Sequence, residues 1–385
     1  MKLRNLMYAT MIACAFASCS KDDVKTPGDG TTNAGTGDAN LSISISLVDV
    51  ATKAETDKNA FEGETTINNI VVAIFQDNNL LGTASSSTTT AKDKVTFTGL
   101  PSKTDLRCIV LANMDKDLIN GLTPEALTKS IAISSPNGFV SGNLPMFALT
   151  EAFQLNSGNN ADKIIPVYRN VARVQLSAIN LNMGHESSKY ASGKATFELN
   201  SVSMNSAAEN GNIDGSAWNT SPTFVSGFAG YKNSNESYVP YFHGDIKGFS
   251  IEQSNFGEPV AMENLAVDGI PVHYFYVFAN TDADNLSVLT VAGKFGFEGK
   301  TKDGSDIIIE PKTSYYPIIV GYDGVVENPA KQVVKNMVYD IQLNIAGSGY
   351  SKPDPTDPDA KDANFSIIAT VAKWTNVIKQ DHTIN

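Results

Sequence analysis

The chain has 385 residues, of which 18% are charged, and its formal net charge is -12. An acidic chain without a cluster of Lys and Arg does not suit nucleic-acid binding, because phosphate contacts require clustered positive charge. The length predicts about two domains. Of the three cysteines only Cys108 lies outside the first 20 residues. The body of the chain is therefore expected to hold together by burial of apolar side chains, with no internal disulfide.

The N-terminal segment has the features of an export signal. Lys2 and Arg4 precede an apolar run that is too short to span a bilayer as a helix, which is typical of a secretory signal. Small residues precede Cys19, which looks like a lipobox, where the cysteine is lipidated and becomes the new N-terminus. Cys14 also follows a small residue, but its apolar run is very short. We expect a lipid on Cys19, and an ordinary cleaved signal peptide is the alternative.

The rest of the chain reads as a polar tether followed by many short strands. Residues 20–40 are polar and rich in Gly, which predicts an unfolded tether. Leu41–Leu47 then alternates strictly between apolar residues and serine, the period of a half-buried strand. Turn-forming residues separate the later runs at a spacing that favours antiparallel β-sandwiches. The strands expected after it are Ile70–Phe75, Val95–Phe97, Arg107–Ala112, Ala172–Leu181, Ala195–Met204, Val272–Ala279, Leu286–Ala292, Tyr316–Val320, Val338–Ile345 and Phe365–Trp374.

One helix and one domain boundary are expected within the body. Thr123 can cap a helix, Pro124 suits its first position and Glu125 suits its positive end. The boundary is expected near Ile165 and Pro166. The resulting plan has a signal at 1–19, a tether with a removable strand at 20–53, β-sandwich domains at 54–165 and 166–350, and a spacer with a final strand at 351–385.

The C-terminal region combines a spacer with another apolar segment. Residues 352–361 are rich in Pro and Asp, which favours an extended linker that does not pack. Residues 365–374 are apolar on both faces of an expected strand. This strand either returns to its own sheet or belongs in another molecule.

The residues give little support for catalysis or metal binding. The four histidines are scattered without metal-ligand spacing, and no cysteine pair offers a zinc site. The chain shows no nucleophile elbow, P-loop or dinucleotide-binding glycine motif. We therefore expect no catalytic residue, no metal and no cofactor. Trp218, Trp374 and the tyrosine-rich segments 238–242 and 315–316 leave open a sugar site, although such aromatic residues more often belong to a core.

A second processing signal follows the alternating strand. Lys53 and Ala54 lie in a polar stretch that a trypsin-like protease can reach. A cut there releases the lipid, the tether and the strand with Leu41, Ile43, Ile45 and Leu47 together. The groove left behind has unpaired edges and can accept a replacement strand. If each copy gives its C-terminal strand to the next, the contact does not close and a filament grows.

These segments, in this order, resemble the type V fimbrial pilins of Bacteroidia, the FimA-like group. Each is a weak strand-like string alone, and their order is much more specific. Besides the signal ending at Cys19, they are Ile70–Phe75, Val110–Asn113, Thr123–Leu127, Tyr168–Val174, Tyr315–Val320, Val338–Ile341 and Val371–Trp374.

The resemblance implies an all-β fold with two tandem transthyretin-like antiparallel β-sandwich domains and a minor helix. It implies lipidation at Cys19, cleavage of the Lys53–Ala54 bond by an Arg- or Lys-specific surface protease, and loss of strand 41–50. The C-terminal segment then acts as the donor strand. Its expected donor residues are Phe365, Ile367, Ala369, Val371 and Trp374, and the inserted face is either the first four of these or Ile368, Thr370, Ala372 and Trp374.

We expect a structural pilin of the fimbrial shaft that supports adhesion and biofilm formation and has no enzymatic activity. Its expected partners are copies of itself, anchor and tip subunits, the protease and, before processing, the outer membrane through the lipid. The expected location is the cell surface. The alternatives are a monomeric surface lipoprotein that binds glycans and, more remotely, an enzyme such as a glycosidase.

Overall fold

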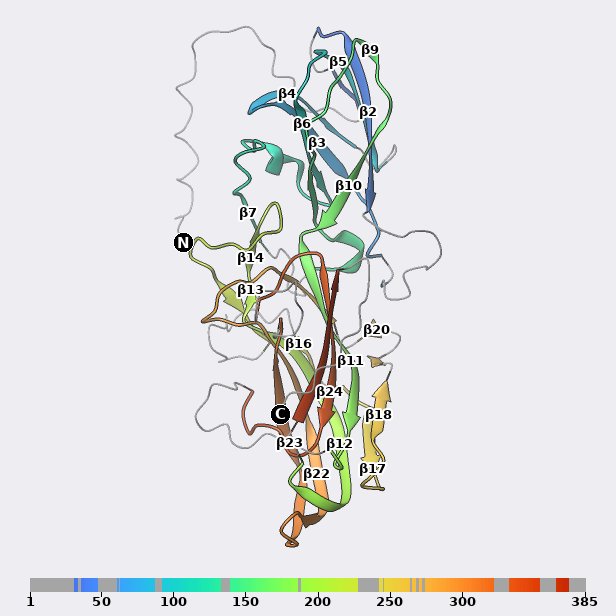
Figure 1. Cartoon of the computed structure of the whole chain (residues 1–385), viewed down its shortest axis with the longest axis vertical. Helices are drawn as coiled ribbons and strands as arrows, with labels where there is room; N and C mark the ends of the chain where they lie inside the picture. Colours follow the sequence, from blue (N-terminus) through green and yellow to red (C-terminus); the bar gives the residue numbers. More distant parts are fainter. Residues whose placement is uncertain are drawn as a thin grey trace, which may run out of the picture.

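The computed structural model describes most of the body of the chain. Side chains are described for residues 36–47, 61, 63–86, 92–132, 139–185, 188–227, 244, 246–263, 265, 274–321 and 332–353, and the backbone alone for 31–33, 242–243, 266–267, 270–271 and 365–373. The described residues form an elongated molecule in which two β-rich halves are stacked end to end (Figure 1). They contain no helix that is long and apolar enough to cross a membrane.

The N-terminal half is built on one mixed sheet of nine strands. The strands lie in the order β1, β5, β2, β10, β8, β6, β3 and β4, and β9 pairs with β2. Because β4 also contacts β1 and β5, the sheet curls round until its two ends meet. The bounds are β1 Thr31–Asn33, β2 Ala39–Leu47, β3 Ile70–Gln76, β4 Asn79–Ser85, β5 Lys94–Leu100, β6 Leu106–Ala112, β8 Met146–Leu149, β9 Gly158–Asn159 and β10 Lys163–Arg169.

The C-terminal half is a sandwich of two sheets. One sheet has the order β18, β11, β24 and β25, with β21 paired to β11, and the other has the order β16, β12, β22 and β23, with β17 paired to β12. The bounds are β11 Val171–Leu181, β12 Tyr190–Asn205, β16 Phe242–His243, β17 Ser250–Gln253, β18 Val260–Glu263, β21 Tyr274–Phe278, β22 Val288–Thr301, β23 Asp306–Ile319, β24 Met337–Ile345 and β25 Phe365–Lys373.

Short elements complete the two halves. Within the described residues the helical ones are two 3-10 turns, η1 and η2. The strand β7 of the N-terminal half pairs with β14 of the C-terminal half, so the sheet pairing also crosses the junction. The bounds are η1 Lys116–Ile119, η2 Ser141–Asn143, β7 Ser130–Ala132, β13 Ala207–Ala208, β14 Asn210–Asn212, β15 Phe224–Val225, β19 Ala266–Val267 and β20 Ile270–Pro271.

Each half has its own hydrophobic core. The first core gathers apolar residues from β2, β3, β5, β6 and β10, such as Ile43, Phe97 and Ile165, which are almost fully buried. It also takes in Phe278 and Val338 from the other half. The second core fills the space between the two C-terminal sheets. Burial of apolar area is the main favourable term in folding, so two such cores explain two units that share one junction.

The structure confirms the all-β class and the tandem β-sandwich arrangement. Every strand expected from the sequence is present, at least in part, among the described residues. The pairing differs from the expectation of purely antiparallel sheets, because β2 runs parallel to β10, and β11 runs parallel to β24. The expected tether over 20–40 is also wrong in its last part. Thr31–Asn33 form β1 beside β5, and β2 begins at Ala39.

The chain passes between the halves later than the expected boundary. Ile165 and Pro166 lie inside β10, which pairs with β2 through residues 163–167. On its other side β10 pairs with β8 only at Tyr168 and Arg169. Proline has no backbone N–H to donate to a neighbouring strand. Pro166 is tolerated because β8 does not pair with β10 at this residue, so no hydrogen bond is lost on that side. Asn170 then separates β10 from β11, the first strand of the other half.

The helix expected at Thr123 is absent from the structure. The backbone amides of Thr123 and Ala126 each donate to the carbonyl of the other, which closes a tight turn. The Thr123 hydroxyl accepts from the Ala126 amide, as a cap does. The Lys129 ammonium then donates to the carbonyls of Leu118 and Asn120, which ties the next residues to η1. Thr123 does make the predicted capping hydrogen bond, but the residues after it do not form an amphipathic run that would support a longer helix.

Candidate functional site

The candidate removable strand, β2, lies inside the N-terminal sheet. It runs antiparallel to β5, with Ile43 opposite Val95, and parallel to β10, with Ile43 beside Lys163. Its backbone is therefore paired on both sides. A gap at this position leaves the facing edges of β5 and β10 unpaired, which is the condition that favours addition of another strand.

The alternation along β2 sends one row of side chains into the core. Leu41 and Ile43 are almost fully buried, Ile45 is buried and Leu47 is half-buried. Burying an apolar side chain of this size contributes about 1.5–3 kcal/mol. If β2 is removed, the space that these four side chains fill becomes an apolar groove between β5 and β10.

The first residues of β2 are fastened by a network of polar contacts. The Gly158 amide donates to the Asp38 carbonyl at 2.7 Å, and the Asn40 side-chain amide donates to Asn159 at 2.9 Å. Gly37 approaches β5 so closely that a Cβ there would lie 2.3 Å from the carbonyl of Leu100. Glycine is required by this close approach of two backbones.

An ion pair links the two strands that flank β2. The Lys94 ammonium on β5 lies 2.7 Å from the carboxylate of Asp162, the residue before β10. The bond from Lys94, followed by one with Ser42 of β2, holds the pKa of Asp162 below its ordinary value. Asp162 is largely exposed and Lys94 partly so, so this pair contributes little energy but spans the outer side of the strand.

The predicted lipidation and cleavage residues, Cys19, Lys53 and Ala54, lie outside the described residues. The description ends at Leu47 and resumes at Phe61. The structure therefore describes the strand before the predicted cut, β2, and the segment after it from Phe61 onward, whose contacts we call the anchor.

That anchor is a buried charge cluster at the junction of the two halves. One guanidinium nitrogen of Arg173 on β11 donates to both carboxylate oxygens of Glu64, at 2.7 and 2.6 Å. The Tyr276 hydroxyl on β21 donates to the same carboxylate at 2.7 Å, and the Phe61 amide does so at 3.0 Å. Arg169 donates from two nitrogens to the Glu64 carbonyl. Glu64 is completely buried and Arg173 and Tyr276 nearly so.

The cluster ties the chain after the predicted cut to the C-terminal half. The Arg173 guanidinium also stacks on the Phe61 ring at 4.1 Å. Burial, reinforced by the negative charge of Glu64, raises the pKa of Tyr276, so its hydroxyl keeps its proton and serves as a donor. Sequence reasoning missed this cluster. Arg173 within the apolar run Val171–Leu181 was the available signal, because a charge in such a strand needs a buried partner.

The C-terminal strand, β25, pairs with β24 of its own chain along its whole length. The register places Phe365, Ile367, Ala369 and Val371 opposite Ile345, Leu343, Ile341 and Tyr339. All four of these β24 side chains are buried in the second core. The register places the alternate positions Ser366, Ile368 and Thr370 opposite the half-buried polar residues Asn344, Gln342 and Asp340. Trp374 lies outside the described residues.

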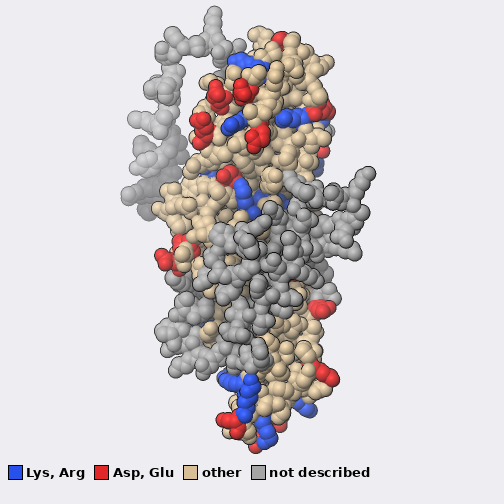
Figure 2. All heavy atoms as spheres, viewed as in Figure 1, with Lys and Arg blue, Asp and Glu red and all other residues tan. Residues whose placement is uncertain are grey.

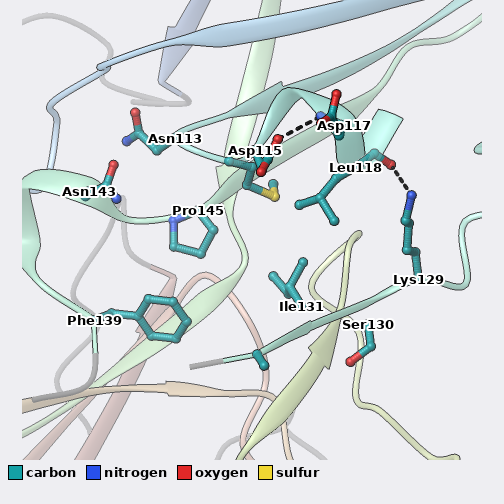
Figure 3. Close-up of a pocket in the computed structure, with 12 residues that line it drawn as sticks. Asn113, Asp115, Asp117, Leu118, Lys129, Ser130, Ile131, Phe139, Asn143 and Pro145 are labelled. Atoms are coloured by element: carbon teal, nitrogen blue, oxygen red, sulfur yellow. Dashed lines mark hydrogen bonds between the residues drawn. The ribbon is translucent and has the colours of Figure 1, made fainter. Parts of the chain in front are cut away.

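A cavity of about 560 Å³ opens beside η1 and β7. Leu118, Ile131, Phe139 and Pro145 line it with apolar side chains (Figure 3). The Lys129 ammonium at its side is already bonded to backbone carbonyls. Phe139 packs edge-on against Phe278 of the other half, with ring centroids 5.0 Å apart. Asp115, Asp117 and Ser130 also line the cavity. Asp115 accepts from the Asp117 amide at the start of η1, and the Ser130 hydroxyl donates to the Asn210 side chain of the other half. These polar groups therefore make local structural contacts beside the junction.

The described part of the chain offers no metal site and no activated cysteine. No group of three or more His, Cys, Asp and Glu residues there could hold a metal ion. Cys108 is fully buried in the first core, and burial raises the pKa of its thiol to about 12, so it is not an activated nucleophile. On the face drawn in Figure 2, Lys and Arg are interspersed with Asp and Glu and form no broad basic surface.

Comparison with known proteins gives consistent matches to fimbrial subunits. Residues 39–200 match the family described as "Major fimbrial subunit protein (FimA)". The chain is 26% identical over 243 residues to the major fimbrium subunit FimA type-2 of Porphyromonas gingivalis, which covers 57% of each chain. It is 25% identical over 323 residues to FimA type-4 of the same species, which covers 72% of this chain and 76% of the relative. The match to type-2 thus spans little more than half of that relative's length.

The solved structures point to the same fold. The crystal structure of a fimbrilin (FimA) from Porphyromonas gingivalis W83 superposes with a TM-score of 0.56 and 19% identity, over 90% of this chain and 99% of the fimbrilin. At this identity the likeness concerns the fold. Residues 39–200 therefore resemble the FimA-like family of fimbrial subunits in sequence, and most of the chain resembles a fimbrilin in fold.

Proposed function

We propose that this chain is a shaft subunit of a surface fimbria and polymerises by exchange of terminal strands. The observation that carries the proposal is the position of β2. One short strand, which precedes the predicted cut, fills a slot between β5 and β10 and supplies a row of core side chains. Its loss leaves both a groove and two unpaired edges, and the chain carries a candidate replacement at its other end.

The proposed pathway begins with export as a lipoprotein. Cys19 carries the lipid and holds the precursor at the outer membrane, and a trypsin-like surface protease cuts the Lys53–Ala54 bond. The cut frees residues 19–53, which include the lipidated Cys19, β1 and β2. The new N-terminal segment stays attached because Glu64, eleven residues further on, is held in the buried cluster with Arg173 and Tyr276.

The proposed donor is the C-terminal strand of a neighbouring copy. Among the described residues β25 lies at the end of its sheet and pairs with β24 alone, so a move to another molecule gives up that one described ladder. Residues opposite one another in an antiparallel pair share a face of the sheet. The register with buried β24 side chains therefore favours Phe365, Ile367, Ala369 and Val371 as the inserted face.

The proposed role is structural. Each copy accepts a strand at one end and donates one at the other, and anchor and tip subunits of the same fimbria complete the assembly. The fimbria supports adhesion and biofilm formation. Catalysis has no part in the proposal, since the FimA relatives are named as fimbrium subunits.

Limited proteolysis of the purified chain without residues 1–19 tests this function. Limiting trypsin should cut after Lys53, as N-terminal sequencing will show, and the products should form ladders on a gel that collapse only on boiling. The Lys53→Ala variant should stay monomeric, and a chain without residues 351–385 should be cut but form no ladder. A cut at Lys53 that yields only monomers would refute strand exchange and favour a monomeric glycan-binding lipoprotein.

A further inference from the structure

The outer face of β10 carries an exposed apolar stripe. Ile164, Pro166 and Tyr168 alternate with the buried residues Ile165 and Val167, so they point away from the core. The exposed fraction is 68% for Ile164 and 43% for Tyr168. These are two of the few large apolar side chains that the described residues expose. We call Ile164, Pro166 and Tyr168 the β10 stripe.

The neighbouring strand leaves this stripe uncovered. The parallel register sets Ile164 beside Ser44 and Pro166 beside Ser46 of β2. On the other side of β2, Ser42 pairs with Thr96 of β5, and their hydroxyls lie 3.3 Å apart. The outer face of β2 is thus a row of small polar side chains. Serine gives little apolar contact to a neighbouring Ile or Tyr, so β2 fits its slot from the inner side only.

The C-terminal strand is built differently from β2 in the sequence. Where β2 alternates apolar residues with Ser42, Ser44 and Ser46, residues 365–374 are apolar at most positions of both alternating sets. If Phe365, Ile367, Ala369 and Val371 enter the groove, the other set, with Ile368, Thr370 and Ala372, faces outward beside β10. A strand that only fills the groove with one row of side chains does not need apolar residues in the outward row.

We propose that the outward set of the C-terminal strand of a second copy covers the β10 stripe in the assembled fimbria. The inference rests on the proposed function and deepens it, because it names a second surface at the same joint. The occupant follows from continuity. A strand that takes the place of β2 between β5 and β10 has its outward side chains directly next to Ile164 and Pro166.

The second contact gives strand exchange a direction. The precursor strand β2 and the donor strand compete for the same slot, and both fill the groove. The donor strand also buries apolar surface on β10 that β2 leaves in water, so it binds more tightly by the amount that this surface contributes. The stripe therefore distinguishes the temporary occupant from the permanent one.

The test compares processed full-length chains that differ only on this surface. In the Ile164→Thr/Tyr168→Thr variant the stripe becomes polar and keeps residues suited to a strand. After trypsin treatment we expect its ladders to form, but to dissociate in warm detergent about tenfold faster than the unaltered chain, the loss expected for two partly buried side chains. The matched control, Leu80→Thr/Ile308→Thr, alters two exposed apolar residues elsewhere and should dissociate at the unaltered rate.

A double-mutant cycle separates a direct contact from a change in folding. Ile368→Thr on the donor should weaken the ladders of the unaltered chain, but should have little additional effect when the β10 stripe is already polar. Uncut variants should unfold at the same temperature as the uncut parent, since the altered acceptor side chains are largely exposed. Unchanged dissociation for the stripe variant, or full additivity with Ile368→Thr, would overturn the inference. Absence of ladders from the unaltered chain would instead contradict the proposed function.

Discussion

The two terminal strands are held in opposite ways. β2 lies between two partner strands and inserts Leu41 and Ile43 into the first core. Within the part of the chain that the structure describes, β25 pairs with one strand, β24, at the end of its sheet. In sequence, β2 has one apolar face, whereas residues 365–374 have two. The strand that we propose to be discarded is therefore the better held one in the single chain, and the strand that we propose to be donated is the easier one to detach.

The difference explains why the proposed assembly needs a protease. Removing β2 exposes two ladders and a row of core side chains, so spontaneous release is strongly unfavourable while the strand remains covalently joined to the body. Moving β25 gives up a single ladder and needs no cut. In the proposed assembly, proteolysis turns a tethered strand into a separate one that can be replaced, and it would control assembly at the end where the energetic cost is large.

The largest effect should come from the anchor that lies between the cut and the body. Glu64→Ala leaves the Arg173 guanidinium buried without its carboxylate, and breaking a buried ion pair in this way costs about 3–5 kcal/mol. We expect the free energy of unfolding to fall by this amount, in both the precursor and the processed subunit. Chemical denaturation of the two forms measures it.

Two variants show whether the charge itself is responsible. Arg173→Met in the Glu64→Ala background removes the unpaired charge and should recover part of the lost stability. Glu198→Ala removes the carboxylate of an exposed ion pair with Lys294 and should cost much less. If Glu64→Ala and Glu198→Ala lower the free energy of unfolding equally, the buried cluster is not an anchor.

A cavity in β2 should separate the two forms of the subunit. Ile43 is fully buried, and an Ile→Ala change at such a site costs about 2–5 kcal/mol. We expect Ile43→Ala to destabilise the precursor by this amount. After cleavage and strand exchange the residue has left the subunit, so the assembled form should be unchanged. Thermal unfolding before and after trypsin treatment measures the difference.

The outer face of β2 supplies the matched control. Ser44→Ala alters the same strand one position away, where the side chain is only half-buried and faces outward. It should leave both forms close to the unaltered stability. Equal destabilisation of the processed, assembled form by Ile43→Ala would mean that β2 stays in place after the cut.

The local sequence pattern was enough to predict most of the strands, including β2, the strand that occupies the candidate groove. The strict apolar–serine pattern of Leu41–Leu47 predicted a half-buried strand, and the structure buries Leu41, Ile43 and Ile45 as that pattern requires. The run Val338–Ile345 was predicted as a strand because it is a short run rich in Val, Ile and Tyr between turn-forming residues, and it forms most of β24. In both segments the local sequence of the strand itself carries the information.

The rest depends on contacts between residues far apart in sequence. The pairing of Glu64 with Arg173 joins residues 109 positions apart and has no local signature. β10 was missed because Pro166 argues against a strand, and only its place beside β8 and β2 makes proline acceptable. The Thr123 helix failed because a good cap was followed by a turn closed by Ala126. Lys53 and Cys19 remain predictions from sequence.

Cys108 can report whether the N-terminal core opens when β2 leaves. In a chain without residues 1–19 it is the only cysteine, and its burial raises the pKa of the thiol to about 12. A thiol reagent needs both access and thiolate. We expect labelling of the uncut chain to be slow, and labelling to become about tenfold faster after the cut in a chain that lacks residues 351–385.

The same measurement contrasts the two terminal strands directly. Removal of 351–385 without a cut takes away β25 from the C-terminal half and should leave Cys108 as slow as before, because Cys108 belongs to the other core. Faster labelling of this uncut, truncated chain would show that the two halves open together.

The smallest effect should come from acidifying the ion pair that spans β2. Because the pKa of Asp162 is lowered in the folded chain, its contribution is present above the ordinary value of 3.8 and is lost as the pH falls through the lowered pKa. After a cut at Lys53, the fragment with β2 should therefore leave slightly faster at a pH below this range than at neutral pH. Size-exclusion chromatography of the cut chain at both values measures the release.

Asp162→Asn should remove this pH dependence and release the fragment at the faster rate throughout. Asp303, whose pKa is also lowered but by Thr301 in the distant β22–β23 turn, provides the matched control, and Asp303→Asn should release the strand as the unaltered chain does. Added salt should mimic the effect of acid, since the pair is exposed and screened. If Asp162→Asn and Asp303→Asn change the release rate of the β2 fragment equally, acid acts on the whole fold. The time that β2 stays bound would then depend on its pairing with β5 and β10 and not on the Lys94–Asp162 ion pair.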